Sequence, residues 1–222
     1  MLSSLVVAAT DGDQYAGVYI NELGLTFTRQ SVELSGAGIG RQMLNPFTMT
    51  TAGITSKPQV PVLPGKTDVF MDTTQVGLGT TKLLRCFRAE WRVAGRYTPI
   101  WPLNSANPSW ERIAEADPDM TLTVRVVSDA QGMALYNTYM KQGTPVYMRV
   151  QNNGATIDTG SLNPYQLRID MAGVVTGVGG KQIDQDLQMI EFTLGAQHDS
   201  GWGTAPGRSH EVRLTNKILT FT

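Results

Sequence analysis

The sequence predicts a mainly β protein, a β-sandwich or open barrel with one flanking amphipathic α-helix and a long extended arm or loop. At least six segments alternate apolar and polar residues, the period-2 pattern of strands with one buried face. One segment has a helical period and lies between two such strands, and another long segment has no sustained period. Because helices do not alternate with the strands, a doubly wound α/β fold is not expected.

The composition is that of one folded domain without covalent cross-links. The chain has 222 residues with 41% apolar content, enough for one core, so we expect a single domain over residues 1–222. Its 18 basic and 19 acidic side chains lack the basic excess of stable nucleic-acid binding. The single Cys86 excludes an intrachain disulfide and fits synthesis in a reducing cytoplasm. The apolar run at 5–9 is too short for a signal peptide or a membrane span.

The segment from Met120 to Gln151 predicts a strand, a helix and a second strand. Apolar and polar residues alternate over 120–126 and again over 146–150. Between them, the apolar residues on one side of a helical wheel are Met133, Leu135, Tyr136, Tyr139 and Met140. The pattern predicts an amphipathic helix of roughly 14 residues. Ser128 and Gln131 form a capping box at its start, and Gly143 suits its left-handed end.

Further alternation predicts the other strands of the sheet. These segments are 18–34, 85–101, 165–171, 187–194 and 212–221. A short helix is expected around Trp110, because Asn107 and Pro108 offer an N-cap and a first-turn proline.

Residues 35–84 have a different character, rich in glycine, proline and threonine. So long a segment without a period is unusual inside a compact domain, where most connections are a few residues long. We interpret it as an arm that lies on a neighbouring subunit, although a floppy surface loop remains an alternative. The apolar residues expected to contact that subunit are Phe47, Met49, Val62, Leu63, Val69 and Phe70.

No catalytic, metal or cofactor site is predicted. The glycines of 36–40 do not fit a dinucleotide loop, because Arg41 and Met43 stand where a third glycine is needed. His198 and His210 have Asp199 and Glu211 beside them, but two surface histidines with solvated carboxylates are commoner than a general base or a metal site.

The remaining candidates are also better explained by structure. Cys86 begins a strand next to Phe87, which favours a buried inert thiol. Asp117 and Asp119 flank a proline as a helix terminator, without the further carboxylates of a calcium loop. Asp184 and Asp186 favour a solvated sheet edge over a cation site.

The order of the parts resembles the tail tube proteins of long-tailed bacteriophages. The resemblance covers 124–222, under half of the chain. Its features are the strand–helix–strand, the re-entry GTPVYMRV at 143–150, the strand YQLRIDMAGVV at 165–175, and an amphipathic strand followed by an extended loop and a terminal strand.

The resemblance implies a structural virion protein without enzymatic activity. Relatives of this kind form rings of six subunits, stacked into a tube through which DNA passes transiently, with tail tip and tail terminator proteins as further partners. The chain would then be made in the host cytoplasm and reside in the phage tail. As lumen-facing acidic residues we expect Asp184, Asp186 and Glu191.

Two other functions stay open at this level. A carbohydrate-binding β-sandwich module would use aromatic residues on one exposed face, and the candidates are Trp101, Trp110, Tyr165 and Trp202. A hydrolase would depend on His198 and His210.

Overall fold

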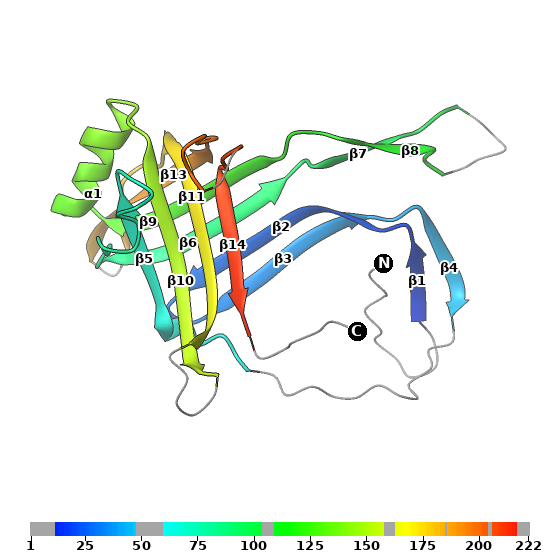
Figure 1. The fold of residues 1–222 in the computed structure, drawn as a ribbon, viewed down its shortest axis with the longest axis horizontal. Coiled ribbons are helices and arrows are strands. Elements are labelled where there is room, and N and C mark those ends of the chain that lie inside the picture. The colour runs from blue at the N-terminus through cyan, green and yellow to red at the C-terminus, as the bar shows by residue number, and fades with distance from the viewer. Residues whose placement is uncertain are drawn as a thin grey trace. The chain divides into compact units, whose positions relative to one another are not determined.

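The computed structural model describes residues 12–47, 60–103, 109–157, 163–184, 186–203 and 206–216 (Figure 1). The protein is mainly β, with 58% strand and 8% helix, which confirms the predicted fold class. The strands of the first half are β1 Gly12–Ala16, β2 Tyr19–Thr28, β3 Val32–Ile39, β4 Gln42–Phe47, β5 Thr67–Asp72, β6 Cys86–Ala94, β7 Tyr97–Ile100 and β8 Arg112–Glu115. Those of the second half are β9 Asp119–Val127, β10 Val146–Thr156, β11 Pro164–Val178, β12 Gln182–Asp184, β13 Leu187–Ala196 and β14 His210–Thr215.

Ten of the described strands form one sheet. Eight follow the order β3-β2-β6-β9-β13-β11-β10-β5, while β12 pairs with β13 and β14 pairs with β11. Two further antiparallel ladders join β1 to β4 and β7 to β8.

The chain divides into two compact units. The first contains Met1–Leu23, Ser35–Gln59 and Val93–Asp119, and the second contains Gly24–Leu34, Val60–Arg92 and Met120–Thr222. The larger second unit holds most of the buried side chains, so it contains the main hydrophobic core.

Alternation along β10 places one face of this strand in the core of the second unit. In β10, Val146, Met148 and Val150 are completely buried, while the residues between them lie on the other face. Six residues of β9, β11 and β13 are equally buried: Leu122, Val124, Ile169, Met171, Phe192 and Leu194. Fully burying one such side chain contributes about 1.5–3 kcal/mol, so these strands provide much of the stability.

Strand β11 connects two parts of the sheet within this unit. Residues Gln166–Met171 pair with β14, residues Gly173–Val178 pair with β13, and β10 lies along the other side. In Figure 1, β5, β10, β11 and β14 run side by side and cross the direction of β9. A Cβ on Gly173 would come within 2.4 Å of the Gly195 carbonyl oxygen, so this pairing needs glycine at 173.

The predicted helix is present but its start is different. It consists of α1, Ala130–Ala134, continued by the π-helical turn η2, Leu135–Met140. Its N-cap is Asp129, whose Oδ1 accepts hydrogen bonds from the backbone N–H groups of Gln131 at 3.0 Å and Gly132 at 3.1 Å. The capping box at Ser128 was therefore wrong, because the next residue offers a carboxylate better placed for the free amides.

The predicted apolar side of the helix is confirmed in its centre. Leu135 is completely buried and Tyr139 is 7% exposed, whereas Met140 is exposed. Gly143 has the left-handed φ of +63° expected after the helix.

Two predicted elements require correction. The strand at 18–34 is a hairpin of β2 and β3, turned at Arg29–Ser31, where the Thr28 hydroxyl accepts from the Ser31 N–H. The short helix around Trp110 is absent from the described residues 109–116, where β8 pairs with β7 instead. Asn107 and Pro108 lie outside the described residues.

Within 35–84, the described residues are partly strand. The end of β3, β4 and β5 all belong to this segment, together with the 3-10 turn η1, Pro64–Lys66. β5 pairs with β10 and buries Val69 and Met71. Only two side chains of β5 face the core, too few for a period to be recognised in a background of glycine, proline and threonine.

The N-cap is testable by mutation. Asp129→Ala should lower the free energy of unfolding by about 1 kcal/mol, or about 2–4 °C in Tm, because two helix amides lose their acceptor. Ser128→Ala is the matched control and should change Tm much less, since the Ser128 hydroxyl contacts only the Met133 sulphur, at 3.5 Å. Thermal unfolding followed by circular dichroism measures both, and equal shifts would contradict the assignment.

Candidate interaction surfaces

The two histidines do not form a common site. His198 is exposed, whereas His210 is half-buried, with its ring centroid 6.4 Å from that of Trp91 and Nδ1 3.2 Å from the Ser209 hydroxyl. Burial, followed by the charge of Arg208, lowers the pKa of His210. An imidazole kept neutral beside a tryptophan is an ordinary packed histidine.

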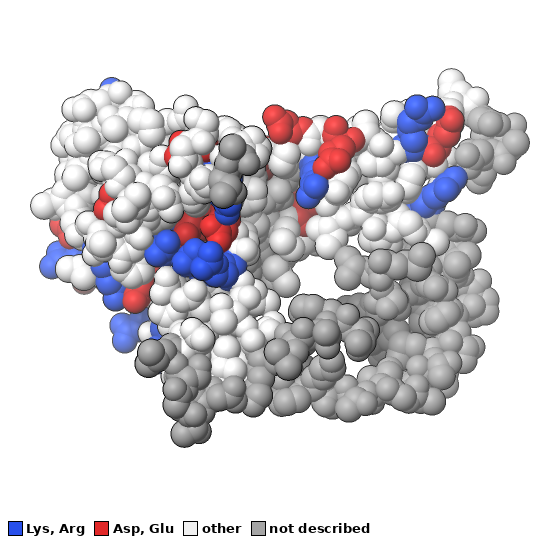
Figure 2. Space-filling view, in the orientation of Figure 1, with Lys and Arg blue, Asp and Glu red and all other residues white. Residues whose placement is uncertain are grey.

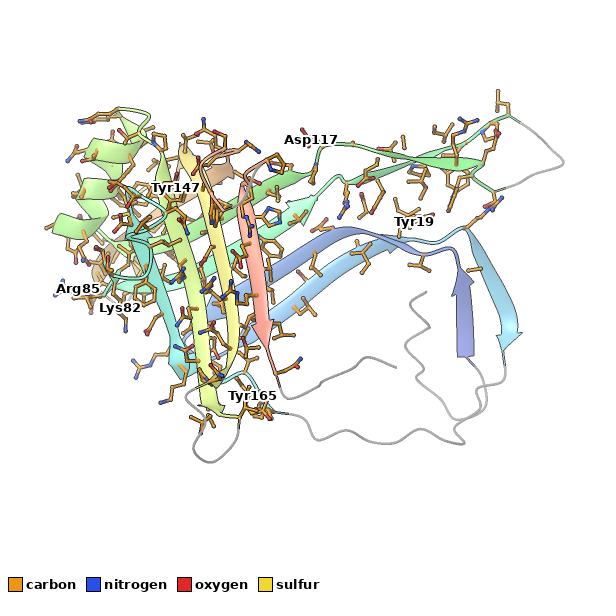
Figure 3. The ribbon with its side chains drawn as sticks, viewed as in Figure 1. Tyr19, Lys82, Arg85, Asp117, Tyr147 and Tyr165 are labelled. Carbon is orange, nitrogen blue, oxygen red and sulfur yellow. The ribbon has the colours of Figure 1, made fainter. Side chains whose placement is uncertain are left out.

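The neighbouring carboxylates already have partners. Asp199 accepts a 2.5 Å hydrogen bond from the Tyr147 hydroxyl and another, at 2.8 Å, from the Gly201 N–H. The hydrogen bond raises the pKa of Tyr147 to about 12 and lowers the pKa of Asp199. Tyr147 also packs edge-on against the buried Trp202, so the hydrogen bond ties the loop after β13 to β10 (Figure 3).

Other chemical groups give no reactive centre in the described part of the chain. Burial raises the pKa of the Cys86 thiol to about 12, although the residue as a whole is partly exposed. A thiol with so high a pKa is a poor nucleophile at neutral pH. No group of three histidine, cysteine, aspartate or glutamate residues is close enough to hold a metal ion among the residues described. Within the same residues, no helix is long and apolar enough to cross a membrane.

A charged network lies on the face of β10 and β11 opposite the core. Asp170 is almost completely buried, and its side chain is only 3% exposed. Arg149 binds it with two hydrogen bonds, Nε to Oδ1 at 2.7 Å and a terminal nitrogen to Oδ2 at 2.9 Å. The Nε of Arg168 lies 3.2 Å from the same Oδ2. A buried carboxylate held by two guanidinium groups fixes the position of all three side chains.

The network continues to Glu211 of β14, which is the register partner of Asp170. One Glu211 oxygen accepts from Arg213 at 2.7 Å, and the other accepts from Arg208 at 3.0 Å. Burial alone would raise the pKa of Glu211, but these guanidinium groups and Arg168 hold it below its ordinary value. Figure 2 shows blue atoms, those of lysine and arginine, gathered over β10, β11 and β14.

The arginine face, as we call this network, has an excess of positive charge. It contains the four arginines Arg149, Arg168, Arg208 and Arg213 against the two carboxylates of Asp170 and Glu211. Burial, the largest cause, and the charges of neighbouring arginines lower the pKa of Arg168. The side chains of Arg208 and Arg213 are 37% and 53% exposed, so they can be reached from solution. Sequence reasoning missed this face because its members come from β10, β11, β14 and a loop.

The residues predicted to contact a neighbouring subunit are in different environments. Val62 and Leu63 are exposed, at 41% and 46%. Phe70 is half-buried on the edge strand β5, on the same face as Arg149, while Val69 is in the core. For Phe47 only the backbone, in β4, is described, and Met49 lies outside the described residues.

The residues predicted to line a lumen are near one another in sequence but are not equivalent. Asp186 is exposed and is the only described residue other than glycine with a positive φ, +62°. Glu191 is half-buried in β13, where its register partner is Arg125 of β9. For Asp184 only the backbone is described, in β12.

The aromatic residues proposed for carbohydrate binding do not share one exposed face. Trp110 and Trp202 are 5% and 2% exposed, so they serve packing. Trp101 is 60% exposed and Tyr165 is half-buried. Trp110 instead forms an aromatic cluster with Tyr19, and the Arg41 guanidinium lies 5.4 Å from its ring centroid.

The ends of the large sheet differ in how they are protected. The outer edge of β5 is covered, because Met71 donates to the Thr81 carbonyl and Leu83 donates to the Val69 carbonyl. β3, at the other end, has β2 as its only neighbour among the described strands, and its residues 33–38 are all exposed. Leu34 in β3 is 70% exposed. Charged side chains commonly protect such edges, but Glu33 is the only one in β3.

Comparison with known proteins gives no family for this chain. No protein-family model matches the sequence, and no curated protein matches it.

The buried carboxylate of the arginine face can be tested for its contribution to stability. Asp170→Asn should lower the free energy of unfolding by about 3 kcal/mol, because two partly buried guanidinium groups lose their counter-charge. Asp68→Asn is the control, since the Asp68–Lys82 pair is exposed on both sides and should cost under about 1 kcal/mol. Urea unfolding measures both variants, and a similar small cost for each would contradict the assigned role.

The Tyr147–Asp199 hydrogen bond predicts a pH dependence of stability. Because the pKa of Asp199 is lowered in the folded state, its contribution is present above the unfolded pKa and is lost as the pH falls through the folded pKa. Urea unfolding between pH 7 and pH 2.5 should therefore show a steeper acid loss for the wild type than for Asp199→Asn. Tyr147→Phe should also flatten the acid loss, and an unchanged profile in both variants would refute this prediction.

Proposed function

We propose that this chain is a structural virion protein of a long-tailed bacteriophage, which assembles into stacked hexameric rings that form the tail tube. In this role it has no enzymatic activity. Its partners are other copies of itself and the tail tip and tail terminator proteins, and DNA passes through the lumen without being held. The protein is made in the host cytoplasm and resides in the phage tail.

The observation that carries the proposal is the edge of β3, which has no second neighbour among the described strands. An edge strand presents unpaired backbone N–H and C=O groups, to which a strand of another chain can bind. β3 is exposed on both faces, lacks proline and lysine, and carries the apolar Leu34 at 70% exposure. By contrast β5 is covered, and β14 carries Glu211 and Arg213. An edge left open on one side of a sheet supports assembly by addition of strands.

Exposed apolar side chains in the first unit give further support. The largest exposures there are those of Leu103 at 109%, Trp101 at 60% and Ile100 at 44%. Large apolar groups in water are commonly covered by a partner protein. Near-neutral net charge is also compatible with a conduit, because a strongly basic lining would hold DNA.

The carbohydrate-binding alternative has less support, because two of its four aromatic candidates are buried. The hydrolase alternative has less support as well, because the carboxylates beside His198 and His210 are occupied by Tyr147 and by arginines.

The proposal predicts assembly that depends on the β3 edge. The purified full chain should form rings or tubes visible by negative-stain electron microscopy, and Leu34→Lys should reduce the polymer fraction at least tenfold, since a charge on an edge strand opposes pairing. Val76→Lys is the matched control, because Val76 is 90% exposed in the turn after β5. This variant should assemble like the wild type.

Two results would contradict the proposed function. One is a wild-type chain that stays monomeric at every concentration and salt condition tested by sedimentation velocity. The other is normal tube formation by Leu34→Lys, which would remove the β3 edge as its basis. A deletion of the whole segment 45–70 is a poorer test, because it removes part of β5 and the core residue Val69.

A further inference from the structure

We propose that the arginine face of one copy binds the carboxylates of Asp117 and Asp119 of a second copy. The contact rests on the proposed self-assembly and names the charged surfaces that orient one subunit against the next. Because the two surfaces are different parts of the same chain, the contact is heterologous, the type of interface that generates rings and filaments.

The arginine face has more positive charge than its own carboxylates neutralise. Asp170 is already shared by Arg149 and Arg168, and Glu211 is shared by Arg208 and Arg213. The buried Nε of Arg168 has no hydrogen-bond partner despite its proximity to Asp170. Two positive charges therefore remain in excess, and the exposed guanidinium groups of Arg208 and Arg213 are positioned to bind two further carboxylate groups.

The surface at Asp117 and Asp119 carries negative charge that no described cation neutralises. Asp117 and Asp119 are both exposed, and among the described residues neither has an ion pair or a side-chain hydrogen bond. Asp117 is labelled in Figure 3. Pro118 keeps the backbone extended, which places side chains two residues apart on the same side and about 7 Å apart. Several other described carboxylates do have cationic partners, as Asp68 has Lys82 and Glu115 has Arg96.

The charge pattern favours a protein carboxylate over nucleic acid. Phosphate-binding surfaces gain affinity from many cations, whereas the arginine face includes two carboxylates that repel a phosphate backbone. The whole chain has a formal net charge of −1. Charged surfaces of this kind chiefly set the orientation and the rate of association, and their effect weakens as salt increases.

The test uses three full-length samples. The first carries Arg208→Glu with Arg213→Glu, the second carries Asp117→Lys with Asp119→Lys, and the third is an equimolar mixture of both variants. Each variant alone should assemble at least tenfold more slowly than the wild type by light scattering. The mixture should regain assembly if the two variants alternate around the ring. The glutamates of the first variant then meet the lysines of the second, and the unchanged arginine face of the second meets the unchanged Asp117 and Asp119 of the first. Such alternation closes only in a ring with an even number of subunits.

The controls separate this contact from general effects of charge and from unfolding. Lys141→Glu with Lys181→Glu makes the same change at two exposed cations outside both the arginine face and the β2–β3 hairpin and should assemble normally. If circular dichroism shows that the variant with Arg208→Glu and Arg213→Glu is unfolded, a variant with Arg208→Gln and Arg213→Gln replaces it. This variant should also slow assembly.

Several results would overturn the inference. The contact would be excluded if either reversed variant assembled at the wild-type rate. It would also be excluded if a mixture of folded variants stayed unassembled. Neither result would contradict the proposed tube function. Binding of a 20-base-pair duplex to the wild type, lost in the arginine variant, would make the face a nucleic-acid surface. A wild type that never assembles removes both the tube function and this contact.

Discussion

The second unit depends on β11, the 15-residue strand that pairs with β10 on one side and with β13 and β14 on the other. Its residues Ile169 and Met171 point into the core, while Asp170 between them points to the opposite face and is just as deeply buried. One strand therefore supports both the hydrophobic core and the arginine face. The close approach of Gly173 to Gly195 allows β13 to pair where β14 ends.

The alternation of Ile169, Asp170 and Met171 makes the strand register unusually specific. A slip by one residue would place the Asp170 carboxylate in the core and expose Ile169 and Met171. Removing a carboxylate from its partners into an apolar interior costs several kcal/mol. The pair of hydrogen bonds from Arg149 acts in the same direction, because Arg149 is the register partner of Asp170. The buried ions thus select one register, even though their net contribution to stability is modest.

The sequence was sufficient for elements with a long apolar period and insufficient for those defined by distant partners. The strands around 120–126, 146–150 and 165–171 and the buried side of the helix were predicted, since Leu122, Met148 and Leu135 follow a clear period. β5 and β8 were missed, because each shows too few inward residues for a period to emerge. The arginine face was missed for a different reason, since Arg208 and Arg213 lie far along the chain from Arg149.

The distribution of charge over the strand edges connects the fold with the proposed self-assembly. Among the described strands β3 has a neighbour on one side only, whereas β5 is covered by residues 81–83 and β14 carries charges, and an edge of this kind can pair with a strand of another chain. Two arginines of the arginine face are only partly neutralised, and among the described residues Asp117 and Asp119 have no cationic partner. Backbone edges supply affinity but little selectivity, whereas opposite charges supply orientation with little affinity. Under the proposed function, the two features together would supply both the affinity and the orientation with which one copy adds to another.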